Sequence, residues 1–140
     1  MQAISLSWKC GAAMNNLNQT LARSVYDKIE AINAAGRDDK YKKKYGKMAL
    51  RLPALVQSAG LLQALAFVEN NNEIPPKDLV GDLASVLVFP TKQDLLDACI
   101  DSPFGEYRYL TRRSVIALTW FKRFAQSTWP EILAAEDDGE

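Results

Sequence analysis

The chain has 140 residues, of which 48% are hydrophobic and 24% charged, so it is long enough to form one domain with a substantial core. Seventeen basic residues balance 17 acidic ones, and there is no histidine, which excludes histidine-based catalysis and histidine metal ligands. The two cysteines, Cys10 and Cys99, are too few for a four-cysteine metal site, and we expect both to be free thiols.

The sequence predicts a cytoplasmic protein with no membrane contact. No apolar run approaches the ~20 residues that a membrane helix needs. The first 15 residues lack a basic region ahead of their apolar part, so they do not resemble a signal peptide, and Met14 is an alternative translation start. We expect an irregular N-terminal extension over residues 1–15, a helical domain over 16–129 and an acidic tail over 130–140.

Two helices are predicted in the first half of the domain. The first is capped by Asn15 or Asn16, carries apolar residues at spacings of three and four, and ends at Gly36. Asp38 is expected to cap the second helix. Proline lacks the amide proton that a helix interior uses, so Pro53 predicts a kink or a restart of this helix.

The second half of the domain also shows helical spacing throughout. Leu61–Val68 is rich in leucine and alanine and is predicted as a helix, Pro75 and Pro76 open the next one, and Thr91 caps a short one. A long last helix is predicted over Glu106–Gln126. No segment shows the alternation of a strand. The sequence therefore predicts an all-α protein, a single compact bundle of six to seven helices.

Charge is segregated along the chain. Residues 36–51 have a net charge of +5, residues 52–107 of −6, residues 108–123 of +5 with no acid, and the last 17 residues of −5. At about 100° per residue, the basic side chains of the second and last helices each gather on one side, away from the apolar side. The first stripe contains Lys40, Lys43, Lys44, Lys47 and Arg51, and the second contains Arg108, Arg112, Lys122 and Arg123.

Stripes of cations along a helix suit a polyanion backbone, which makes all nine residues candidate nucleic-acid-binding residues. The alternative is that they belong to solvated helix surfaces, where lysine stems also cover apolar edges. The chain has no glycine-rich nucleotide loop and no nucleophile motif. Acid pairs such as Asp78 and Asp82 are too few to hold a metal ion. We expect no catalytic residue, metal, cofactor or small-molecule substrate.

Two segments carry a family resemblance. LPALVQSAGLLQALAFV, at Leu52–Val68, resembles the pattern L-P-x-L-(I/V)-x-x-x-G-L-x-x-x-L-A-F. YRYLTRRSVIALTWFKRFA, at Tyr107–Ala125, resembles the closing motif Y-x-x-L-T-x-x-(A/S)-(V/L/I)-x-x-x-x-W-(L/F)-K-R-F-A. With the basic stretch YKKKYGKMALR, they resemble the small helical subunit of the type III-B CRISPR effector complex, the Cmr complex, over about residues 16–127.

The resemblance implies a non-catalytic all-α subunit of an antiviral ribonucleoprotein. Copies of such a subunit stack head to tail beside the backbone subunits that hold the guide RNA, and they help to line the channel for target RNA. Its implied partners are target RNA or the guide–target heteroduplex, the backbone subunits and other copies of itself. The implied phosphate-contacting residues are Lys122 and Arg123 in WFKRFA, Arg108 and Arg112 upstream, and Lys43, Lys44, Lys47 and Arg51 in the basic stretch.

The charge blocks also predict how copies stack, with the acidic segment 69–106 of one copy against a basic face of the next. Two alternatives stay open at this point. One is a helical scaffold whose basic faces bind acidic protein surfaces without RNA, and the other is a free-standing nucleic-acid-binding protein. The sequence leaves open which stripe faces RNA and which faces a neighbouring subunit. Arg113 stands where the family pattern often has an acid, and neither the extension nor the tail belongs to that pattern.

Overall fold

The computed structural model describes residues 9–135, with side chains described from residue 16 onward. Within this part the protein consists of helices and contains no strand, which confirms the all-α prediction. The seven helices are α1 (Lys9–Ala34), α2 (Asp39–Ala59), α3 (Leu61–Glu69), α4 (Ile74–Val86), α5 (Lys92–Asp101), α6 (Phe104–Thr128) and α7 (Pro130–Ala134).

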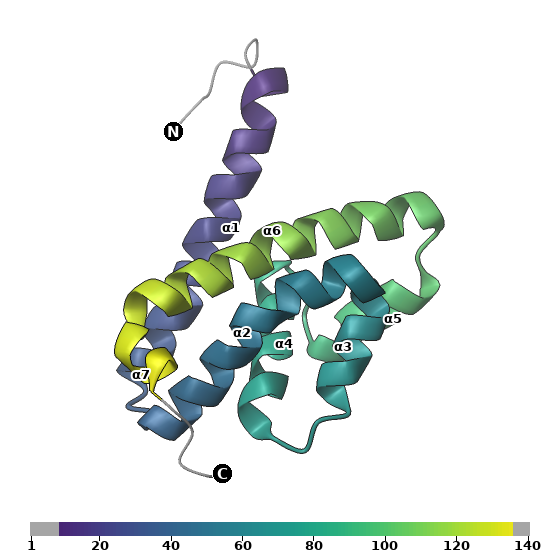
Figure 1. Cartoon of the computed structure of the whole chain (residues 1–140). Coiled ribbons are helices and arrows are strands. Elements are labelled where there is room, and N and C mark those ends of the chain that lie inside the picture. Colours follow the sequence, from purple (N-terminus) through teal and green to yellow (C-terminus); the bar gives the residue numbers. More distant parts are fainter. Residues whose placement is uncertain (1–8, 136–140) are drawn as a thin grey trace.

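The long helices α2 and α6 pack against each other at the centre of the bundle and run in opposite directions (Figure 1). Gly60 at the end of α2 lies beside Tyr107 at the start of α6, whereas Gly46 near the start of α2 lies beside Leu133 of α7. Helix α1 crosses α6, and its first turns project beyond the rest of the bundle (Figure 1). Helices α3, α4 and α5 cover the remaining side.

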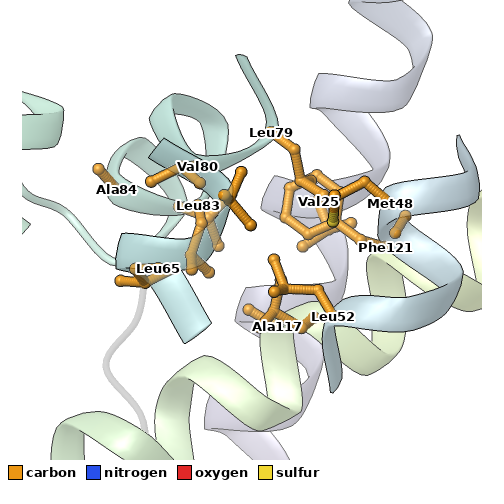
Figure 2. Packing of buried hydrophobic residues seen from close by; sticks show 14 of the residues in the cluster. Val25, Met48, Leu52, Leu65, Leu79, Val80, Leu83, Ala84, Ala117 and Phe121 are labelled. Carbon is orange, nitrogen blue, oxygen red and sulfur yellow. The ribbon is translucent and has the colours of Figure 1, made fainter. Parts of the chain in front are cut away.

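The core forms where the apolar sides of helices α1 to α6 converge, and Figure 2 shows part of it. Val25 of α1, Leu52 of α2, Leu65 of α3, Leu83 of α4 and Phe121 of α6 are all fully buried. Apart from Leu65, which stands in a continuous apolar run, these residues belong to the apolar sides that the sequence spacing predicted, because positions three and four residues apart share one side of a helix. Burying this side of α2 and α6 leaves their basic sides facing outward.

Several predicted helix ends are confirmed in detail. The Asp38 carboxylate accepts the backbone N–H of Tyr41 at 2.9 Å, as an N-cap does. Thr91 and Asp94 form a reciprocal capping box at the start of α5. Gly36 follows α1 with a φ of 71°, a left-handed conformation that glycine adopts without a steric penalty.

The ends of the predicted domain differ from the structure. Helix α1 begins at Lys9, so the expected irregular extension over residues 1–15 is wrong for residues 9–15, while residues 1–8 lie outside the described part. Alanine and methionine before Asn15 favour helix and extend it past the expected cap. At the other end, α7 packs on α2, so residues 130–134 belong to the bundle, and residues 136–140 of the expected tail lie outside the described part.

Two backbone features break local rules. Helix α2 runs without interruption through Pro53, so the predicted restart is wrong. Pro53 and its neighbour Leu52 are both buried, and this packing offsets the lost backbone hydrogen bond. After α4 the chain turns at Val88, which has a φ of 69° and is 82% exposed. A β-branched residue in this left-handed conformation is strained.

Candidate nucleic-acid interface

The α2 basic face consists of Lys40, Lys43, Lys44, Lys47 and Arg51, on the side of the helix opposite Leu52 and Val56. All five line one open groove of about 620 Å³. Lys40 and Arg51 are exposed and the three central lysines are half-buried. The structure therefore brings the whole first predicted stripe into one site.

Acidic side chains form part of the walls of this groove. Asp39, Glu73 and Glu131 line it together with the five cations, and Lys44 forms an ion pair with Glu73. Glu73 precedes α4 and Glu131 belongs to α7, so both are brought to α2 by the tertiary fold. The groove lining keeps a positive excess, but its field is weaker than the sequence of α2 alone implies.

The α6 basic face consists of Arg108, Arg112, Lys122 and Arg123, and all four side chains are exposed. No acidic residue occurs in the sequence between Tyr107 and Trp129, so nothing on this helix offsets the positive charge after its first turn. None of these four cations lines the groove on α2. The two predicted stripes therefore form two separate faces.

Aromatic rings lie beside the cations on both faces. The Arg108 guanidinium is 5.6 Å from the centre of the Phe104 ring, and the Arg123 guanidinium is 5.4 Å from that of Trp120. Phe104 is 75% exposed. On the α2 face, Arg51 lies 5.8 Å from the ring of Phe67. The sequence interpretation missed both rings. Phe104 lies four residues before Arg108, whereas Phe67 stands on α3, which has no basic residue, and only the fold brings it to Arg51.

Other aromatic residues of α6 hold the fold together. The Tyr107 hydroxyl accepts the backbone N–H of Leu62 at 3.0 Å, which ties the start of α3 to α6. The half-buried Trp120 donates its indole N–H to Asn18 of α1 at 2.8 Å and stacks on Phe124. Both residues therefore have structural roles, in which the ring packs and the polar group of the side chain makes a hydrogen bond.

Arg113 has a structural contact of its own. Its guanidinium donates to the backbone oxygen of Leu87 at 3.0 Å and lies 5.6 Å from the ring of Tyr109. It thereby joins α6 to the loop after α4 and is turned away from the four cations of the α6 basic face. The unusual residue at this position anchors a loop.

The acids of α4 are bound to tyrosines of α2. The Tyr41 hydroxyl donates to Asp78 and the Tyr45 hydroxyl donates to Asp82, each at 2.6 Å. Burial raises the pKa of Asp82 above its ordinary value, and the Tyr45 hydrogen bond lowers it. Burial raises the pKa of Tyr45, so its hydroxyl stays protonated as the donor. Sequence reasoning missed these two hydrogen-bonded pairs. Their only signal in the sequence is that the two tyrosines are four residues apart and the two aspartates are also four residues apart.

The remaining chemistry of the described residues is limited. Burial raises the pKa of the Cys99 thiol to about 11, which keeps it protonated. No group of three metal-ligating side chains occurs among the described residues. Within residues 9–135, no helix is both long enough and apolar enough to cross a membrane.

Comparison with known proteins identifies the family. The family model described as "CRISPR-associated protein (Cas_Cmr5)" matches residues 17–128. The chain belongs to the Cmr5 family. A curated relative, the CRISPR system Cmr subunit Cmr5 of Thermus thermophilus, is 41% identical over 115 residues, which cover 81% of this chain and 96% of that protein. The family resemblance found in the sequence motifs is therefore confirmed.

A solved structure supports the same assignment at the level of the fold. The crystal structure of a Cmr5 family protein from Thermus thermophilus matches with a TM-score of 0.68 and 37% identity, covering 79% of this chain and 95% of that one. The Cmr5 match includes both basic faces and ends with the last residue of α6. Residues 1–16 and 129–140, including α7, lie outside it.

Proposed function

We propose that this Cmr5 family protein is a non-catalytic small subunit of a type III-B CRISPR effector complex. In this complex its basic helix faces contact the backbone phosphates of target RNA or of the guide–target heteroduplex. Base pairing with the guide supplies sequence specificity, and the subunit supplies positive charge and shape without reading bases. The subunit would thus take part in RNA-guided antiviral defence, and its contacts with RNA need no cofactor.

The observation that carries this proposal is the α6 basic face. Four exposed cations follow one side of the helix from Arg108 to Arg123, and the same stretch contains no acid. At a rise of 1.5 Å per residue, this face is roughly 22 Å long, enough to follow several phosphates of one strand. The exposed ring of Phe104 beside Arg108 adds a surface on which a base or sugar can rest.

We assign the α2 basic face a second set of phosphate contacts. Its groove holds five cations, but Glu73 and Glu131 in the walls weaken the field. We therefore expect binding at this face to contribute less affinity than binding at the α6 face. Repeated weak sites gain affinity when copies are linked in one assembly, because each bound copy raises the local concentration of the next site.

Stacking of copies is the second part of the proposal. We infer that the acidic segment 69–106 of one copy faces a basic face of the next. Asp78 and Asp82 already bind tyrosines within the chain, so the exposed acids Asp97, Asp101 and Glu106 are better placed for this contact. Reversing these three charges is expected to prevent stacking, and unchanged assembly would contradict this contact.

The test is RNA crosslinking in the assembled complex with charge-neutralised variants. One variant changes four residues of the α2 face to glutamine, and another changes the four of the α6 face. A control changes the same number of cations elsewhere. The three sets are Lys43, Lys44, Lys47 and Arg51; Arg108, Arg112, Lys122 and Arg123; and, as the control, Arg23, Lys28, Lys77 and Lys92.

We expect the α6 variant to assemble but to lose target-RNA crosslinks, and the control to keep them. In solution, loss of four phosphate contacts should reduce the slope of log affinity against log salt by about 3 for single-stranded RNA. If instead the crosslinks persist while assembly fails, the basic faces are joints between proteins and the scaffold function is correct. Sequence-selective binding of duplex DNA by the isolated chain would favour the free-standing regulator.

A further inference from the structure

Helix α7 brings the C-terminal end of the described chain to the α2 basic face. The Leu133 side chain lies against Gly46, so close that a Cβ atom at Gly46 would come within 2.5 Å of Leu133 Cδ2. Gly46 is thus the position that lets α7 pack tightly on α2. As a result Ile132 and Ala135 line the same groove as the basic residues of α2. The chain continues beyond Ala135 from the wall of that groove.

The sequence that follows is strongly acidic. Residues 136–140 read Glu-Asp-Asp-Gly-Glu, with four carboxylates and no cation. The α2 face from Lys40 to Arg51 spans eleven helical rises, or about 16 Å. Five extended residues reach about 17 Å. Because α7 packs beside Gly46, midway along this face, the segment is long enough to reach either end of it.

We propose that residues 136–140 bind the α2 basic face of their own chain and compete there with polyanions. The acidic segment takes the place of RNA phosphates while the subunit is free, and a phosphate backbone displaces it in the complex. The displacement step rests on the proposed function, whereas binding of the segment to α2 does not. The α6 basic face lies outside the groove and keeps its accessibility throughout.

Attachment favours the chain's own segment over other occupants. A short tether gives an effective concentration in the millimolar range, above that of a free acidic partner. Each exposed ion pair is weak and screened by salt, so the segment acts as a competitor that RNA can displace. Because residues 129–140 lie outside the Cmr5 family match, this competition is a property of the present chain added to the family core.

The first measurement is zero-length carbodiimide crosslinking of the full chain, which joins carboxylates to amines that are already in contact. We expect amide links from the acids of residues 136–140 to Lys40, Lys43 or Lys47. Mixing isotopically labelled with unlabelled protein separates links within a chain from links between chains. Links within the chain support the proposal. Links to these lysines only between chains, or none to them, overturn it.

The second measurement is the affinity of the chain for a 12-nucleotide oligouridylate, followed by fluorescence anisotropy. The test variant neutralises two acids of the segment, and the control neutralises two exposed acids of α1, so both gain the same net charge. The test changes are D137N and D138N, and the control changes are D27N and E30Q.

At about 0.05 M salt we expect the test variant to bind roughly fivefold more tightly than the control. The gain should disappear at about 0.5 M salt, and also when K43Q and K47Q remove cations from the α2 face. Equal affinities for the two variants, in a protein that binds RNA through its α2 face, would overturn the inference and leave the proposed function standing. If crosslinks form within the chain but no variant binds RNA, the binding of residues 136–140 to α2 is supported. The proposed contact with RNA is then overturned.

Discussion

The hydrogen bond between Tyr45 and Asp82 joins α2, which carries a basic face, to α4. Tyr45 is fully buried, and its hydroxyl donates to the Asp82 carboxylate at 2.6 Å. The substitution Tyr45→Phe keeps the ring, which packs edge-on against Phe121 and Trp129, and removes only the donor. Hydrogen bonds to charged groups contribute about 1.5–3 kcal/mol, and we expect a loss of about 2 kcal/mol in the free energy of unfolding.

Tyr41→Phe is the matched control. Its hydroxyl makes the same contact, with Asp78 at 2.6 Å, but Tyr41 is only half-buried. Water can therefore replace the lost donor, and we expect a smaller loss of about 0.5–1 kcal/mol. The comparison isolates burial, because the two pairs have the same chemistry and lie one helical turn apart.

The loss in the free energy of unfolding caused by Tyr45→Phe should also depend on pH. Burial raises the pKa of Asp82 above the ordinary value of 3.8, so the folded protein binds more protons than the unfolded protein between these two values. The contribution of Asp82 to stability therefore falls as pH rises through its folded pKa. Tyr45→Phe removes the hydrogen bond that lowers the pKa of Asp82, so the total fall in stability becomes larger. The variant should lose most stability above the folded pKa and less below it.

Urea unfolding followed by circular dichroism measures both effects, with an unchanged m-value as the check on two-state behaviour. As the pH is lowered from neutrality toward the ordinary carboxyl pKa of 3.8, the difference in stability between Tyr45→Phe and wild type should narrow. In thermal unfolding near neutral pH, the loss corresponds to a Tm about 7 °C lower. If Tyr45→Phe and Tyr41→Phe differ by less than about 0.5 kcal/mol at every pH, the argument from burial is wrong.

Three further predictions test local features of the fold. Val88→Gly should raise the free energy of unfolding by about 1 kcal/mol in urea titration, because glycine relieves the left-handed strain, and a loss would contradict this. Thr91→Ala removes half of the capping box with Asp94 and should lower stability by about 1 kcal/mol, measured as a lower Tm. In a C10S background, Cys99 should react with a thiol reagent near pH 8 only on unfolding, since burial raises its pKa to about 11; rapid labelling of the folded protein would refute this.

The sequence predicted those parts of the fold that depend on local chemistry. The buried positions of α1, such as Val25 and Ile29, follow from apolar spacing alone. The capping roles of Asp38 and Thr91 follow from short side chains placed next to the first turn. The outward direction of both basic stripes also follows, because a helix that buries one side exposes the other.

Contacts between distant segments explain what the sequence did not predict. Pro53 remains inside a helix because tertiary packing buries it together with Leu52, and helix propensity contains no information about that packing. Glu73 and Glu131 enter the groove from other helices and offset lysines that the sequence placed on an uninterrupted basic face. The bond from Tyr45 to Asp82 spans 37 residues, and only the folded chain brings the two together.

The pairing of α1 with α6 has a consequence for biogenesis. The indole groups of Trp120 and Trp129 donate to Asn18 and Asn33, so the helix that is synthesised first is tied to one that is synthesised almost last. Helices α2, α3 and α4 contact near neighbours and can associate while the ribosome is still translating. Until α6 emerges, the apolar side of α1 lacks its main partner. A nascent chain stalled before α6 is therefore expected to expose that side to chaperones, and completion of the last long helix closes the bundle.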